Sequence, residues 1–121
     1  MRAISGFLYR NAVKPVLFRI PADSVHEFFL KSGKNIGKIG AAKKILHGIW
    51  ASEDVRLEND VCGIHFKNPI GLSAGFDYDA NLVDVLPSLG FGFHTIGTLT
   101  HGAYAGNEPP MLGRLPKYRD S

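Results

Sequence analysis

Two short stretches of the sequence end in small and hydroxyl-bearing residues, which are the residue types of a ligand-facing loop. Residues 68–77 read Asn-Pro-Ile-Gly-Leu-Ser-Ala-Gly-Phe-Asp, and residues 95–100 read Thr-Ile-Gly-Thr-Leu-Thr. Ser73, Ala74 and Gly75 carry no bulky side chain, so a flat or phosphorylated ligand could lie directly against the backbone there. The two stretches therefore predict neighbouring strands of a βα barrel, with a cofactor lying across their carboxyl ends.

A strand–helix–strand unit is needed to place these two loops side by side. The sequence predicts a strand over 70–73, then a helix that is capped by Asp79 and closed by Gly90, then a strand over 91–96. The apolar residues of the expected helix are Leu82, Val83, Val85 and Leu86, and Pro87 disturbs its end. Strand, helix and strand within about 30 residues form a βα unit with parallel strands.

The first fifty residues carry helical patterns. Pro21 near a start, Asp23 or Ser24 as a cap and Gly33 as a stop predict one helix. Its apolar face consists of Ala22, Val25, Phe28 and Phe29.

A second amphipathic pattern runs from Asn35 to Trp50. Three glycines weaken it by roughly 1 kcal/mol each relative to alanine, so this helix needs a surface to pack on. Upstream of both helices, Gly6 and Pro15 limit any helix in residues 1–20 to short pieces.

Between the helices and the barrel-like region, residues 55–57 and 64–66 alternate in polarity and predict a short hairpin. A domain boundary is expected near residues 51–54. After Thr100, residues 101–110 are expected to form a loop, and residues 112–115 a short strand or an extended connection.

Composition bounds the class of protein. The 121 residues suffice for one small domain, and 45% hydrophobic with 21% charged residues excludes wholesale disorder. The single Cys62 excludes an intramolecular disulfide and a Cys-rich zinc site, fits a reducing compartment and is expected to be an ordinary buried thiol. No metal site is expected, and no apolar run reaches the roughly 18 to 20 residues that span a bilayer. The interrupted start of the chain argues against a secretory signal.

Charge is divided unevenly. Residues 1–50 hold nine Lys or Arg against two acids, and residues 51–121 hold five against nine. The basic half either attracts an anionic membrane or nucleic acid, or is simply a solvated helix face. Likewise, the two helices either form a membrane-surface module with an apolar groove or pack on the rest of the same protein.

The motifs of the barrel-like region resemble dihydroorotate dehydrogenase. The resemblance lies in residues 66–69, 71–77, 89–93, 96–100 and 106–107, and in Arg114-Leu115-Pro116, in the same order and spacing. Residues 9–11, 18–19 and 26–27 resemble the N-terminal extension of the membrane-associated, quinone-dependent subtype.

The resemblance implies an α/β fold that is the start of a (β/α)₈ TIM barrel, preceded by an α-helical extension. It divides the chain into residues 1–52, a membrane and quinone-tunnel extension, and residues 53–121, the first part of an FMN-binding barrel. The implied activity is the oxidation of dihydroorotate to orotate in pyrimidine biosynthesis, with electrons passing through FMN to a quinone. The implied location is peripheral, at the cytoplasmic side of the cell membrane in a bacterium, with no nucleic-acid partner.

Carried onto this chain, the resemblance assigns the FMN site to one loop and one strand end. The small residues permit close approach of a flavin, and a hydroxyl at a strand end suits a flavin edge or phosphate. The assigned cofactor-binding residues are Ala74, Gly75, Phe76, Asp77, Tyr78 and Thr98. Tyr78 is also assigned to the substrate. The family usually has a lysine there, and a tyrosine offers only a neutral hydrogen bond near pH 7, so the substrate itself is open. His101, where the family commonly has proline, is a milder departure.

No catalytic base is assigned to this chain. A complete barrel of this type needs about 250 residues, so the base is expected beyond Ser121 and the 121 residues alone are expected to be poorly folded and inactive. Ser73, Thr98, Thr100 and His94 are local substitutes, and none has a partner visible in the sequence. Two alternatives remain: a non-catalytic membrane-binding helical module with a vestigial barrel, and a related FMN barrel oxidoreductase that acts on another substrate.

Overall fold

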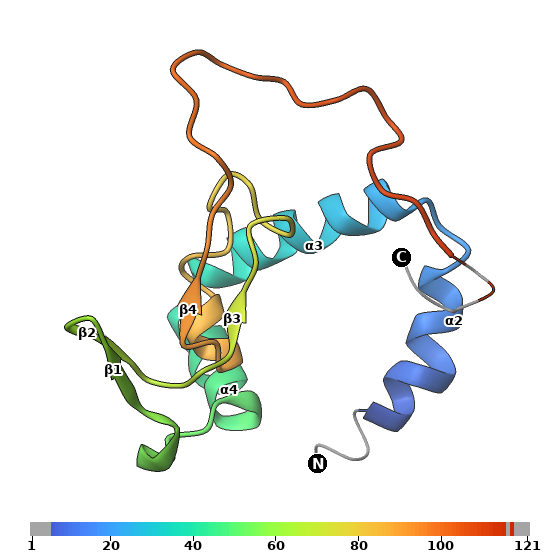
Figure 1. Ribbon diagram of the computed structural model, residues 1–121. Coiled ribbons are helices and arrows are strands. Elements are labelled where there is room, and N and C mark those ends of the chain that lie inside the picture. The colour runs from blue at the N-terminus through green and yellow to red at the C-terminus, as the bar shows by residue number, and fades with distance from the viewer. Residues whose placement is uncertain (1–5, 116, 118–121) are drawn as a thin grey trace. The chain divides into compact units, whose positions relative to one another are not determined.

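The computed structural model describes residues 6–115 and 117, and the chain divides into two compact units. One unit contains the residues before Leu30 together with those after Leu99, and the other contains Leu30–Leu99. The helix α3 (Ala22–Gly37) begins in the first unit and ends in the second. Each unit is described by itself below (Figure 1).

The first unit opens with a helical segment over residues 6–17. Residues 6–8 are α-helical, Tyr9–Val13 form a π-helical stretch, and α2 (Lys14–Leu17) follows. The α-helical pieces are short, as expected, although the π-helical stretch between them makes the segment helical throughout. A proline ring clashes with the carbonyl four residues earlier in an α-helix, and the wider π turns stand immediately before Pro15.

The second unit is organised around a small apolar core. Its buried members are Leu82, Val85 and Leu86. Six half-buried residues from the surrounding elements pack against them, namely Leu30, Ile36, Leu46, Leu72, Leu89 and Phe91. The core thus joins the end of α3 and the helix α4 (Gly40–Trp50) to the strands.

Two glycines in α3 lie against this core. The sequence predicts that Gly33 stops the helix, but α3 continues to Gly37, and the next helix begins at Gly40 rather than Asn35. A side chain at Gly33 would collide with Leu82, and a Cβ at Gly37 would lie 2.9 Å from the Cβ of Asp84. These glycines therefore allow α3 to pack closely on the segment 82–85. From the sequence pattern alone, Gly33 is predicted to be a helix end.

The central strands are β3 (Gly71–Leu72) and β4 (Phe93–His94), which lie side by side in Figure 1. They pair in parallel, with Gly71 opposite Phe93 and Leu72 opposite His94. The predicted parallel pairing of the two strands is confirmed, although both strands are shorter than the ranges 70–73 and 91–96. Asn68 ties their starts together: its side chain donates to the Gly90 carbonyl at 2.9 Å and accepts from the Ile70 amide at 2.9 Å.

The segment between β3 and β4 departs from the predicted helix. Residues 81–85 form turns, and the only regular piece is a 3₁₀ turn over Leu86–Leu89. Gly90 closes it with φ of +86°, as expected from the freedom of glycine in the left-handed region. Pro87 sits early in this turn, where its missing N–H is tolerated.

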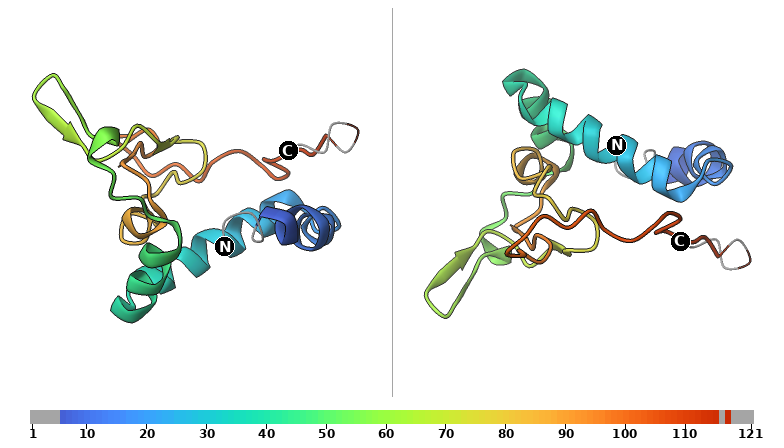
Figure 2. Two further views of the ribbon diagram at one scale, coloured as in Figure 1. Left: turned by 90° about the horizontal axis from the view of Figure 1, so that it is seen from below. Right: turned by 90° about the horizontal axis from the view of Figure 1, so that it is seen from above.

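A β-hairpin precedes β3 and projects from the rest of its unit (Figure 2). Its strands are β1 (Asn59–Val61) and β2 (Ile64–Phe66), which pair antiparallel. The expected first strand over 55–57 is wrong. Val55–Leu57 forms a 3₁₀ turn, because the Asp54 carboxylate caps it by accepting from the Arg56 amide.

The tip of the hairpin explains why its first strand lies at residues 59–61 and not at 55–57. Cys62 and Gly63 both have positive φ, +53° and +79°, as a two-residue hairpin turn requires. Cys62 is consequently exposed rather than buried. Beside the hairpin, the hydrogen bonds from Arg56 hold the pKa of Asp54 below its usual value.

Candidate cofactor-binding site

The loop after β3 presents an open backbone. Phe76 donates its amide to the Ser73 carbonyl at 3.2 Å, which makes a tight turn. Ser73, Gly75 and Phe76 are exposed and Ala74 is half-buried. Apart from Gly75 itself and its two chain neighbours, no described residue has an atom within 4 Å of the position that a Gly75 Cβ would take. Gly75 is therefore not needed for packing among these residues, and it leaves space on which a flat ligand can lie.

Asp77 turns inward from this loop. Its side chain is fully buried, and the carboxylate accepts from the amides of Asn81 at 2.9 Å and Leu82 at 2.7 Å. Asp77, and not Asp79, thus caps the turns that lead to the core. The correction has a physical cause, because the buried carboxylate has two amide donors within reach and Asp79 is exposed. The side chain of Asp77 supports the loop, so only the backbone of Asp77 is available for contact with a cofactor.

Tyr78 and Gly97 join the two strand ends. The Gly97 amide donates to the Tyr78 carbonyl at 3.1 Å. Gly97 is buried, and a side chain there would collide with the Tyr78 ring, so the ring lies on the glycine backbone. Tyr78 is 62% exposed and Thr98 is exposed beside this contact. Both residues are therefore accessible at the carboxyl ends of β3 and β4.

His94 has a neighbour that the sequence did not reveal. Its side chain is 11% exposed, and its Nε2 lies 3.6 Å from the Asp77 Oδ2. Of the other local substitutes for a base, Ser73 and Thr98 are exposed, and the Thr100 hydroxyl donates to the Gly102 carbonyl at 2.6 Å. None of these four residues is thus placed as an activated nucleophile.

The donor set fits FMN. The loops after parallel β3 and β4 open at the same end of the pair, as the strands of an α/β site do. Ala74 and Gly75 allow close approach on one loop, and Thr98 offers a hydroxyl on the other. Among the described residues no group of three His, Cys, Asp or Glu side chains could hold a metal ion.

The first unit holds a separate hollow of about 400 Å³. It lies between the corner before α3 and the chain near its end. Its lining residues are Phe18, Arg19, Ile20, Pro21, Ala22, Asp23, Pro110, Leu112 and Arg114. Asp23 closes it by accepting from the amides of Met111 at 3.1 Å and Leu112 at 2.9 Å, which makes Asp23 an anchor for this segment.

Arg114 is the charged wall of this hollow. Its Nη2 donates to the Ile20 carbonyl at 3.0 Å, and its guanidinium carbon stands 4.6 Å from the centre of the Phe18 ring. Its Nε is buried and has no hydrogen-bond partner among the described residues. The sequence marks Arg114 only as part of a motif, because nothing local indicates that it would meet Phe18 and Ile20.

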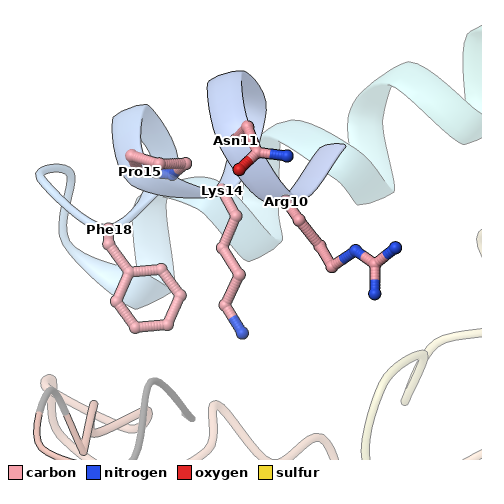
Figure 3. Close-up of a pocket in the computed structure, with 5 residues that line it drawn as sticks. All are labelled: Arg10, Asn11, Lys14, Pro15 and Phe18. Atoms are coloured by element: carbon pink, nitrogen blue, oxygen red, sulfur yellow. The ribbon is translucent and has the colours of Figure 1, made fainter. Parts of the chain in front are cut away.

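A second hollow of about 490 Å³ borders the same unit. Arg10, Asn11, Lys14, Pro15 and Phe18 line it, and Figure 3 shows Arg10, Lys14 and Phe18 pointing to one side of the helix. The Lys14 ammonium lies 5.2 Å from the Phe18 ring. Neighbouring apolar residues are exposed, including Phe7, Leu8 and Val16. No helix in the described part of the chain has the length and apolar character to cross a membrane.

Comparison with known proteins gives one consistent result. The profile of the family described as dihydroorotate dehydrogenase matches residues 56–118. A protein named dihydroorotate dehydrogenase (quinone) from Christiangramia forsetii is 41% identical over 108 residues, which cover 89% of this chain and 32% of that protein. Proteins of the same name from Helicobacter acinonychis and Chloroflexus aurantiacus are 41% identical over 101 residues and 38% identical over 120 residues. These alignments cover 84% and 97% of this chain and 29% and 33% of the two relatives. The chain thus spans about a third of the length of the curated relatives it matches.

Proposed function

Because this chain belongs to the dihydroorotate dehydrogenase family, we propose that it forms the helical extension and first βα unit of an FMN-dependent enzyme. The proposed reaction is the oxidation of dihydroorotate to orotate, with a quinone as the final electron acceptor. The proposed fold is the start of a (β/α)₈ barrel, with residues 1–52 as the extension and 53–121 in the barrel. The observation that carries the proposal is the parallel pair β3–β4, whose two carboxyl-end loops are open and lined by small or hydroxyl-bearing residues.

FMN, when bound, supplies the two-electron acceptor for dihydroorotate and the donor for the quinone. The chain's own residues bind and orient it. Ala74 and Gly75 offer backbone on which the flavin can lie, Phe76 and Asp77 complete the loop, and Thr98 offers its hydroxyl. Tyr78 borders both the cofactor and the substrate. The general base for the substrate proton belongs to residues outside this chain.

For the quinone, the hollow beside Arg114 has suitable chemistry. Apolar walls accommodate a ring and tail, and an incompletely hydrogen-bonded guanidinium is a donor for a carbonyl oxygen. The exposed apolar residues of the helix 6–17, together with Arg10 and Lys14, suit peripheral contact with an anionic membrane surface, at the cytoplasmic side in a bacterium.

The reaction is tested with the protein in its full native length. FMN binding is followed by the loss of flavin fluorescence, and turnover by the reduction of a soluble quinone with dihydroorotate. We expect both in the full-length protein, and neither in the 121 residues alone, since a barrel of this kind needs about 250 residues. A full-length protein that binds FMN but does not oxidise dihydroorotate would refute the proposed reaction.

The quinone assignment has its own test. Replacing Arg114 by alanine is expected to raise the KM for quinone about tenfold, in the range of one lost charge-assisted hydrogen bond. Reduction of the bound flavin by dihydroorotate in a single turnover should stay unchanged. Arg56→Ala at the exposed hairpin base is the matched control, and an effect of equal size there would contradict the assignment.

Tyr78 favours a second candidate, a related FMN oxidoreductase with another small substrate. The residue is exposed at the mouth of the site and supplies a neutral hydroxyl where the family usually has a lysine. Tyr78→Lys would add a cation for an anionic substrate. High dihydroorotate activity in the unchanged protein excludes this candidate, whereas activity that arises only in Tyr78→Lys supports it.

A further inference from the structure

His94 is a half-buried residue whose two ring nitrogens are buried and lack hydrogen-bond partners among the described residues. It lies on β4, and neither Nδ1 nor Nε2 has a hydrogen-bond partner in the described part of the chain. A buried imidazole without partners is costly, because it loses its hydrogen bonds to water. An apolar residue would fill the same space without that cost. The position of this histidine therefore needs a reason beyond packing.

The Asp77 carboxylate supplies that reason. It is completely buried and carries hydrogen bonds from two backbone amides, those of Asn81 and Leu82. A carboxylate has about four acceptor positions, so two remain. His94 Nε2 lies 3.6 Å from Oδ2. This separation is slightly longer than a hydrogen bond, and a small movement of the loop would bring the two atoms within hydrogen-bond distance.

The two residues stand at the roots of the two cofactor-facing loops. Asp77 directly follows the loop of Ala74 and Gly75, and His94 precedes Gly97 and Thr98 on the next strand. The same two segments are already joined through their backbones, by the hydrogen bonds from Thr95 to Leu72 and from Gly97 to Tyr78. The side-chain pair would add a link at the Asp77 end of the loop, between these two backbone hydrogen bonds, and would hold the side of the loop that faces the core.

Resting on the proposed function, we propose that His94 is a positioning residue, which holds the Ala74–Gly75 loop through Asp77 and thereby sets the affinity for FMN. His94 itself does not touch the cofactor in this arrangement. It acts by donating Nε2–H to the Asp77 carboxylate, which in turn holds the amides of Asn81 and Leu82. The spacing of the two loops then matches the flavin before it binds, which lowers the ordering cost of binding.

The experiment compares FMN dissociation constants in the full-length protein. His94→Leu fills the space without a donor and is expected to bind FMN at least tenfold more weakly. His94→Gln retains an N–H donor and is expected to stay within about threefold of the unchanged protein. In an Asp77→Asn background, His94→Leu should cost less than twofold further, because its partner is already altered. His65→Leu, on the exposed hairpin, is the control for loss of a histidine and should change nothing.

The visible circular dichroism spectrum of the bound flavin reports its orientation in the site, which a purely structural role of His94 would not change. At saturating FMN we expect an altered spectrum in His94→Leu and the normal spectrum in His94→Gln. If His94→Leu binds FMN normally, or if both variants weaken binding equally, the positioning role is wrong while the proposed function stands. If the unchanged protein does not bind FMN, the proposed function fails and this role fails with it.

Discussion

The end of α3 offers a quantitative test of how closely the helix packs on the turn behind the cofactor loop. In Gly37→Ala, the new Cβ would lie 2.9 Å from the Asp84 Cβ and 3.4 Å from the Val85 amide nitrogen. Carbon atoms prefer about 3.5 to 4.0 Å. The obstructing atoms belong to the backbone or adjoin it, so a change of rotamer cannot relieve the contact.

Two opposing terms set the magnitude. Alanine in place of glycine gains at most about 1 kcal/mol in a helix. Overpacking a core costs about 1 to 3 kcal/mol. Gly37→Ala is therefore expected to lower the free energy of unfolding by up to about 2 kcal/mol. Gly48→Ala in α4 meets no described atom within 4 Å, so the same substitution there should raise it by about 0.5 to 1 kcal/mol.

The assay is urea unfolding of both variants in the full-length protein, followed by circular dichroism. We expect opposite signs and a difference of about 2 kcal/mol between the two. Gly33→Ala should fall between them, because the atoms it meets are side-chain ends of Leu82 and Val85. Equal stability of Gly37→Ala and Gly48→Ala would refute the close approach of α3 to the segment 84–85.

Two further predictions concern the strand ends and the anchored segment. Gly97→Ala places a methyl group in the Tyr78 ring and should weaken FMN binding about tenfold, or about 1.4 kcal/mol, in a fluorescence titration. Gly102→Ala, which meets no described atom within 4 Å, should not, and equal effects would contradict the stacked ring. Asp23→Ala removes the acceptor of two amides in the segment 111–112, so limited proteolysis should cut there several times faster. An unchanged cleavage rate would mean that Asp23 does not anchor this segment.

Several features of the fold could be predicted because their signals are local. The small residues after β3, the glycine that closes the turn at 90, and the parallel order of β3 and β4 follow from residue types and spacing. The helix α3 starts next to Pro21, at Ala22, for the same reason. Its end could not be predicted, since Gly33 reads as a stop in isolation and proves to be a contact surface for Leu82.

The first strand of the hairpin and the cap of the segment 81–85 are also predicted incorrectly, although the residues that decide them are close in the sequence. Residues 55–57 alternate as a strand would, yet Asp54 captures the Arg56 amide and turns them into a 3₁₀ turn. Asp79 has the right spacing for a cap, yet Asp77 is the aspartate that the fold buries with its carboxylate on two amides. In each case the sequence pattern allows two local structures. The hydrogen bonds that select one of them form only in the folded chain.

The sequence by itself determined the family and the small residues of the candidate FMN loop. These depend only on the identity and order of the residues, which the sequence gives in full. Only the tertiary structure decided that the His94 ring lies beside Asp77, that Tyr78 lies on Gly97 and that Arg114 faces Phe18. Each of these contacts joins residues that are distant along the chain, and burial and charge act on such pairs through space rather than through sequence.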